Sequence, residues 1–127
     1  MPHQLLLATR NKGKIEEFRR ILEAIAPGEI ELLGLDKFSD LHDVVEDGET
    51  FQENALKKAR EMSLATGLPA IADDSGLCVD ALNGDPGIFS ARWAGSHGDD
   101  EANTAKVLNQ LRDVPDERRS AHFTCVA

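Results

Sequence analysis

Cysteine, positive charge and long apolar runs are all scarce in this 127-residue chain. Its two cysteines, Cys78 and Cys125, show neither a disulfide pattern nor the Cys-x-x-Cys spacing of metal ligands, so we expect two buried thiols in a reducing compartment. No apolar run approaches membrane-spanning length, and the first residues carry no basic, signal-like region. We therefore expect a soluble, cytoplasmic protein without membrane partners.

Basic residues are outnumbered, with 14 Lys and Arg against 23 Asp and Glu and a formal net charge of −9. A nucleic-acid-binding surface needs clustered positive charge, so this balance argues against one. Any phosphate-bearing ligand would have to be held by a few local cations and a metal ion.

The order of apolar periodicities predicts an α/β fold. Strands are predicted over residues 5–8, 30–33, 68–72 and 121–127, and helices over 15–25, 50–67 and 102–111. Strands that alternate with helices indicate layers, and we treat residues 1–127 as a single α/β domain. The last predicted strand has no polar tail, which we interpret as a C-terminal truncation. Residues 83–87 predict a dense turn.

Two adjacent carboxylates, Asp73 and Asp74, follow a buried strand, and Ser75-Gly76 predicts a turn directly after them. Such carboxylates repel one another unless a cation, water or donors accept their charge. Hard oxygen ligands suit Mg²⁺, so a divalent metal is one solution. The alternative is a turn in which one Asp caps the loop, and this pair alone does not decide between them.

Residues 8–14, between the first strand and the first helix, are a second candidate segment. Asn11 is a good N-cap, Gly13 keeps the backbone open, and a helix N-terminus offers unpaired N–H groups to an anion. Three basic side chains add charge: Arg10, Lys12 and Lys14. The segment predicts a triphosphate cradle without the Walker spacing. An ordinary capped helix with solvated lysines is the alternative.

Helical periodicity distinguishes two lysines of the second helix. Lys58 falls inside the apolar stripe, whereas Lys57 points to solvent. Lys58 therefore needs an acidic partner or a phosphate, unless its stem snorkels, and we favour a ligand. Glu53 fits a capping box with Thr50 and is assigned to structure. Glu46 is a candidate metal ligand, with a solvated acidic loop as an equal alternative.

Four motifs follow one another along the chain. They are ATRNKGK at 8–14, TFQENA at 50–55 with KAR at 58–60, ADDSGL at 72–77 and PGIFSAR at 86–92. Together they resemble the inosine/xanthosine triphosphate pyrophosphatase family, and the resemblance runs from residue 5 to residue 126. It implies an elongated mixed α/β sheet flanked by helices, two lobes around a central cleft, and a homodimer.

The resemblance implies Mg²⁺-dependent hydrolysis of ITP, dITP and XTP to the nucleoside monophosphate and pyrophosphate, which keeps these bases out of nucleic acids. Asp74 looks like the general base and a metal ligand, with Asp73 beside it at the metal. Glu46 is our additional candidate ligand. The resemblance assigns Thr9, Asn11, Lys14 and Lys58 to the triphosphate and Ser75 to the nucleotide, and the loop analysis adds Arg10, Lys12 and Gly13.

Two departures limit this transfer. Arg10 stands where many members have Gly, and the Phe-Gly-Tyr-Asp and Ser-His-Arg motifs that contact the base in the family do not occur here. A non-catalytic nucleotide-binding or interaction fragment is therefore the alternative function. A haloacid-dehalogenase-type phosphatase is excluded, because Ser75 and Gly76 stand where its second Asp would be needed.

Overall fold

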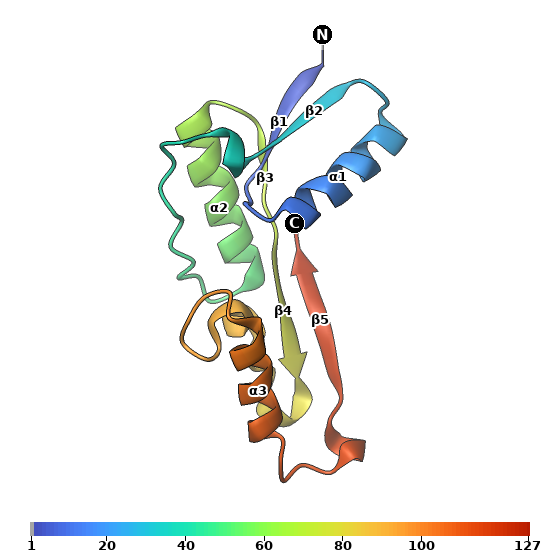
Figure 1. Cartoon of the computed structure of the whole chain (residues 1–127), viewed down its shortest axis with the longest axis vertical. Coiled ribbons are helices and arrows are strands. Elements are labelled where there is room, and N and C mark those ends of the chain that lie inside the picture. The colour runs from blue at the N-terminus through green and yellow to red at the C-terminus, as the bar shows by residue number, and fades with distance from the viewer. Residues whose placement is uncertain (1) are drawn as a thin grey trace. The chain divides into compact units, whose positions relative to one another are not determined.

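The computed structural model describes residues 2–127, which form two compact units. The first contains residues 2–48, 52–73 and 127, and the second contains residues 49–51 and 74–126. Figure 1 shows the elements in chain order. They are β1 (His3–Leu7), α1 (Lys12–Ile25), β2 (Ile30–Gly34), α2 (Phe51–Thr66), β3 (Ala70–Ile71), β4 (Asp74–Val79), α3 (Asp100–Gln110) and β5 (Ala121–Val126). Four short 3-10 helices join them: η1 (Leu35–Lys37), η2 (Asp80–Leu82), η3 (Gly87–Arg92) and η4 (Asp116–Arg118).

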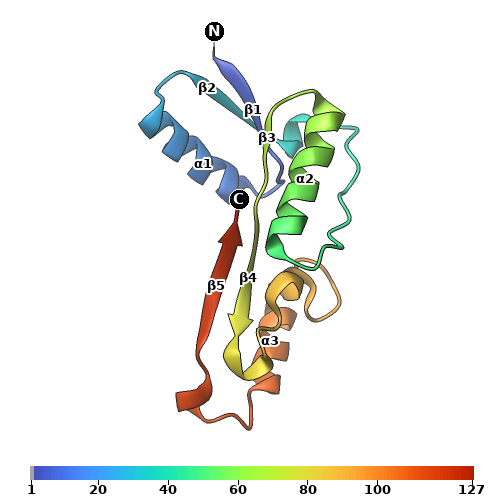
Figure 2. The same ribbon diagram turned by 180° about the vertical axis from the view of Figure 1, so that it is seen from behind.

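A three-stranded parallel sheet with the order β2-β1-β3 forms the centre of the first unit. The register of β1 against β2 runs from His3 opposite Ile30 to Leu7 opposite Gly34. Parallel neighbours need crossover connections, and α1 and α2 provide them on opposite faces of the sheet (Figures 1 and 2). The predicted α/β class is confirmed, and the helices flank a parallel sheet in the first unit.

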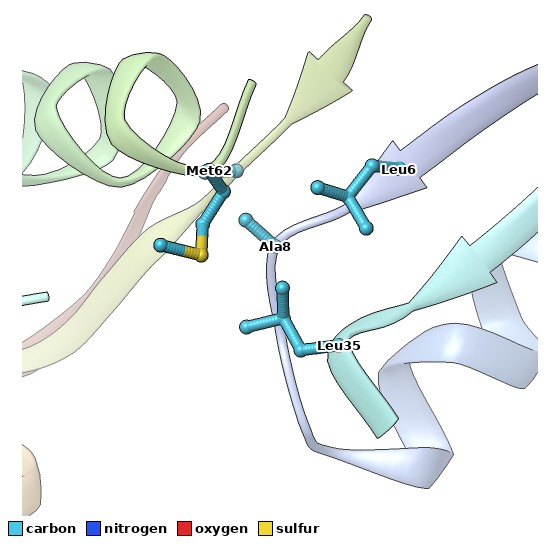
Figure 3. Close-up of a cluster of buried hydrophobic side chains, with 5 residues drawn as sticks. Leu6, Ala8, Leu35 and Met62 are labelled. Atoms are coloured by element: carbon cyan, nitrogen blue, oxygen red, sulfur yellow. The ribbon is translucent and has the colours of Figure 1, made fainter. Parts of the chain in front are cut away.

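The two faces of β1 bury different side chains because successive residues of a strand point to opposite sides. Leu6 and Leu7 are both fully buried. Leu6 packs with Ala8, Leu35, Met62 and Ala72 under α2 (Figure 3). Leu7 packs with Ile15 and Leu32 under α1. The apolar run at the start of the chain therefore contributes to two small hydrophobic cores, one on each face of the sheet.

In the second unit, β4 pairs antiparallel with β5, from Asp74 opposite Val126 to Val79 opposite Ala121. Its core consists of Val79, Val107 and Leu111, with Trp93 and Val114 packed against them. The dense turn predicted at residues 83–87 is confirmed by positive φ angles at Asn83, Gly84 and Gly87.

The predicted Ser75-Gly76 turn is wrong, because both residues lie inside β4. A Cβ atom at Gly76 would lie 2.2 Å from the Gly87 carbonyl oxygen and 2.7 Å from Ser90 Oγ. The glycine is therefore explained by the close approach of another backbone to the strand. From sequence alone, a glycine needed for such an approach cannot be distinguished from a glycine in a turn.

Cys78 is buried, but Cys125 is exposed, so the expectation of two buried thiols is wrong for Cys125. Cys125 stands two residues after Phe123 on the same face of β5, and Phe123 is 78% exposed. Within residues 2–127, no helix combines the length and the apolar character that crossing a membrane requires.

Burial in the α2 core predicts unequal effects for two substitutions in the same helix. Met62 is 1% exposed and Leu64 is 86% exposed. Met62→Ala should lower the free energy of unfolding by about 2–5 kcal/mol, because it removes buried apolar contacts and leaves a cavity. Leu64→Ala should change it by less than about 0.5 kcal/mol. Urea unfolding followed by circular dichroism measures both, and equal losses would contradict the packing of this core.

Candidate functional site

The N-terminus of α1 is organised by Asn11, which is confirmed as its N-cap. Asn11 Oδ1 accepts a hydrogen bond from the Lys14 amide at 3.2 Å, and the Asn11 amide donates to Thr9 Oγ1 at 3.1 Å. A Cβ atom at Gly13 would lie 3.2 Å from Asn11 Oδ1, so glycine gives the cap its room. The first turn carries Lys12 and Lys14 and no acidic residue, so its charges add to the positive end of the helix dipole.

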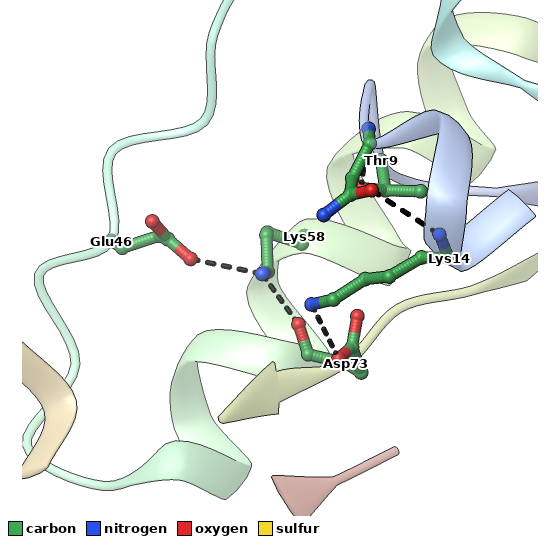
Figure 4. Close-up of polar contacts among 6 residues, drawn as sticks. Thr9, Lys14, Glu46, Lys58 and Asp73 are labelled. Atoms are coloured by element: carbon green, nitrogen blue, oxygen red, sulfur yellow. Dashed lines mark hydrogen bonds and ion pairs between the residues drawn. The ribbon is translucent and has the colours of Figure 1, made fainter. Parts of the chain in front are cut away.

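Asp73 stands two residues after the end of β3, immediately before β4, and is buried, with 5% of its surface exposed. Its Oδ2 atom lies 2.8 Å from Lys14 Nζ (Figure 4). Removing a carboxylate from water is unfavourable unless a cation or donors compensate for the lost hydration. The ammonium group of Lys14, carried by the first turn of α1, provides that compensation.

Lys58 contacts the same residue from α2. Its ammonium group donates to the main-chain carbonyl oxygen of Asp73 and lies 2.9 Å from Glu46 Oε1 (Figure 4). The Lys58 side chain is 20% exposed, which agrees with its predicted place in the apolar stripe. The sequence predicts either an acidic partner or a phosphate for Lys58. In the structure the acidic partner is present, and it is Glu46. Two ammonium groups, from α1 and α2, thus converge on Asp73.

Lys57 serves as the comparison within α2. Its Nζ atom lies 2.7 Å from Asp47 Oδ1, and 68% of the Asp47 side chain is exposed. The hydrogen bond from Lys57, together with its positive charge, lowers the pKa of the Asp47 carboxyl. The outward direction predicted for Lys57 is consistent with this exposed pair, which solvent and salt screen.

Residues 38–48, called the acidic loop below, run beside α2 without regular secondary structure (Figure 1). Besides Glu46 and Asp47, two of its side chains contact the rest of the first unit: Asp43 forms an ion pair with Arg10 at 2.9 Å, and His42 Nε2 lies within hydrogen-bonding distance of Glu61 Oε1, at 3.2 Å. Arg10 therefore directs its charge toward the acidic loop.

The predicted site residues divide between the two units. Six of them come together in the first unit: Thr9, Asn11, Lys14, Glu46, Lys58 and Asp73 (Figure 4). Lys12 and Gly13 belong to the adjoining first turn of α1. Asp74 and Ser75 open β4 in the second unit, where they stand opposite Val126 and Cys125.

One residue beside the site was not assigned a role from sequence. Asn54 is 1% exposed, and its Oδ1 atom accepts a hydrogen bond from the Gly48 amide at 2.8 Å. A sequence signal was available, because Asn54 precedes Lys58 by four residues and so lies on the same face of α2.

Two carboxylates of the site are candidates for a metal. Glu46 and Asp73 both contact Lys58, but within residues 2–127 no group of three His, Cys, Asp or Glu side chains is arranged to hold a metal ion. Mg²⁺ is commonly bound through one or two carboxylates together with substrate phosphates. A divalent ion at these two carboxylates would therefore need further oxygen ligands, such as those of a bound phosphate.

Convergent lysines beside a helix N-terminus can bind a phosphate chain. We therefore expect substitution of Lys58 and substitution of Lys57 to have unequal effects on the affinity for a phosphate chain. Lys58→Met should weaken binding of inorganic triphosphate about tenfold or more, the range for a lost hydrogen bond to a charged group. Lys57→Met removes the same charge from the exposed pair and should change the affinity less than about twofold. Titration calorimetry at fixed salt measures both constants, and equal affinities would contradict the assignment of Lys58 to the site.

A curated relative of this chain is the "dITP/XTP pyrophosphatase" of Streptomyces coelicolor, which is 60% identical over 124 residues. The match covers 98% of this chain and 62% of the relative. The chain thus spans between half and about three-fifths of the length of the curated relatives it matches.

Two solved structures are similar as well. The nucleoside-triphosphatase, or dITP/XTP pyrophosphatase, of Mycobacterium abscessus superposes with a TM-score of 0.81 at 52% identity, over 96% of this chain and 62% of that one. A HAM1 protein from Coxiella burnetii gives a TM-score of 0.85 at 43% identity, over 98% of this chain and 61% of that one. A model of the Ham1 family matches residues 5–127. The chain therefore belongs to the Ham1 family.

Proposed function

We propose that the protein hydrolyses the non-standard purine nucleoside triphosphates ITP, dITP and XTP to the nucleoside monophosphate and pyrophosphate. The observation that carries this proposal is the convergence of Lys14 and Lys58 on buried Asp73, beside the capped N-terminus of α1. Relatives that are 54–60% identical to this chain are named dITP/XTP pyrophosphatases, which supports the same substrate class. We further propose that the protein acts in the cytoplasm, as its composition suggests, and forms a homodimer, as the family resemblance implies.

The residues around α1 and Lys58 are assigned to the triphosphate. Lys14 and Lys58 would exchange part of their contact with Asp73 and Glu46 for phosphate oxygens, because ammonium groups bind phosphate as point charges. Backbone amides at the start of α1 add donors to the same anion. The remaining assigned contacts are Thr9, Arg10, Asn11, Lys12 and Gly13, with Ser75 toward the nucleotide.

Asp74 is assigned the role of general base. Its carboxylate would accept a proton from water as the water oxygen attacks the α-phosphorus, and the bond from that phosphorus to the bridging oxygen breaks to release pyrophosphate. Negative charge grows on the phosphate oxygens during this step, and the lysine ammonium groups reduce its cost. Asp74 follows Asp73 directly in the chain, so the base adjoins the residue on which both lysines converge.

We assign Mg²⁺ to the carboxylates of Asp73, Asp74 and Glu46. When bound, the ion would neutralise phosphate charge and orient the phosphate chain. The lysine partners of Asp73 and Glu46 hold these side chains in place, so their oxygen atoms are already positioned when a metal–phosphate complex arrives.

Removal of the general base should affect turnover far more than folding. Asp74→Asn in a protein of the relatives' full length should lower Mg²⁺-dependent pyrophosphate release from ITP about 10²–10⁴-fold. Asp113→Asn, at an exposed position of the second unit, is the control and should leave the rate nearly unchanged. Near-normal turnover by the Asp74 variant, with its circular dichroism unchanged, would remove Asp74 from the mechanism.

Base selectivity should be weak in the 127-residue chain alone. Discrimination arises from polar groups that a wrong base leaves unpaired, and the base-contacting motifs of the family do not occur in this sequence. We expect rates of pyrophosphate release from ITP, XTP, ATP and GTP that differ less than about tenfold, whereas a protein of full length should prefer ITP and XTP.

A strong preference for ITP by the 127-residue chain would show that residues 1–127 contain base recognition. Absence of pyrophosphate release from all four nucleotides, despite nucleotide binding, would favour the non-catalytic alternative for this chain.

A further inference from the structure

A buried amide side chain connects α2 to the acidic loop. Asn54 is among the most buried side chains of the chain, with 1% of its surface exposed. Its Oδ1 atom accepts a hydrogen bond from the Gly48 amide at 2.8 Å. Buried polar groups are stable only when they are hydrogen-bonded, so this contact couples the position of the loop backbone to the first turns of the helix.

Gly48 fits closely against the same part of α2. A Cβ atom there would lie 2.7 Å from Asn54 Oδ1, 2.8 Å from Glu53 Cβ and 3.2 Å from the Asn54 amide nitrogen. Separations below 3.0 Å force some atoms to move, and the Asn54 side chain lies in a packed interior. Glycine at position 48 therefore permits the short contact by which Asn54 fixes the backbone.

This fixed point adjoins the carboxylate of the site. Glu46 stands two residues before Gly48, and its Oε1 atom lies 2.9 Å from Lys58 Nζ. Lys58 stands one helical turn after Asn54 on the same face of α2. One face of one helix thus provides both the anchor for the loop backbone and the cation that the loop carboxylate contacts.

We propose that Asn54 is a positioning residue, which fixes the acidic loop through Gly48 and thereby holds the Glu46 carboxylate opposite Lys58. The inference rests on the proposed function, in which Glu46 binds Mg²⁺ and Lys58 binds phosphate. Asn54 acts through the loop and contacts neither ligand. Its loss should therefore raise the Mg²⁺ concentration needed for turnover and leave the chemical step at saturating Mg²⁺ little changed.

The test uses variants of the protein in its full length. Asn54→Leu keeps the approximate size and removes the acceptor, whereas Asn54→Asp keeps an acceptor oxygen and serves as the rescue variant. Asn103→Leu is the matched control, because Asn103 is also buried and binds backbone groups, the Ala94 amide and the Ala91 carbonyl, in the second unit. Gly48→Ala disturbs the same contact from the loop side if Asn54→Leu does not fold.

Amide hydrogen exchange reports positioning without any turnover. In Asn54→Leu, exchange in residues 42–48 should accelerate about tenfold or more while α3 keeps its protection, and Asn54→Asp should restore part of the protection. Unchanged exchange in this segment would overturn the proposal. Because this readout needs no catalysis, it decides the anchoring role even if the parent protein releases no pyrophosphate, an outcome that would overturn the proposed function separately.

Kinetics then test the route through Glu46. Asn54→Leu should raise the Mg²⁺ concentration for half-maximal pyrophosphate release about tenfold. When Glu46→Gln is already present, the same substitution should raise that concentration less than about twofold, because the effects of residues that act through one another are not additive. Asn103→Leu should lower stability without this shift. Additive effects, or an equal shift in the Asn103 variant, would overturn the proposal.

Discussion

The burial of Asp73 is the constraint on which the rest of the site depends. A carboxylate that is 5% exposed at the end of a parallel strand needs positive partners. Lys14 meets its side-chain oxygen and Lys58 meets its carbonyl oxygen. These partners come from the helix before and the helix after β2, so the βαβ connections that build the sheet also bring the cations together.

The acidic loop completes this arrangement by placing Glu46 beside Lys58. Positive and negative groups then alternate across the first unit, from Lys14 to Asp73, Lys58 and Glu46. Such an arrangement suits a ligand that is itself mixed in charge. In the proposed function, a triphosphate with a divalent cation would offer oxygens to the lysines and a metal to the carboxylates, so the lysine–carboxylate contacts could be exchanged without leaving a charge unpaired.

Much of the first unit was predictable because its signals are local. The N-cap role of Asn11 follows from residue type and position at a helix start, and the inward direction of Lys58 follows from helical period. β4 was missed because Gly76 is typical of turns in sequence, whereas here it accommodates the Gly87 carbonyl. The exposure of Cys125 was missed for a related reason, since an apolar run does not tell which strand face is covered.

The sequence by itself determined the order of the helices and of every strand except β4, the capped start of α1 and the four motifs of the Ham1 family, because each depends on residues close together in the chain. Only the tertiary structure decided that Lys14 and Lys58 share Asp73, that Glu46 is the partner of Lys58, and that Asn54 holds Gly48. The physical reason is that the first of these contacts joins segments separated by whole elements, and the other two depend on the path of an irregular loop. Their pairing is set by the sheet register and by burial, which no local pattern encodes.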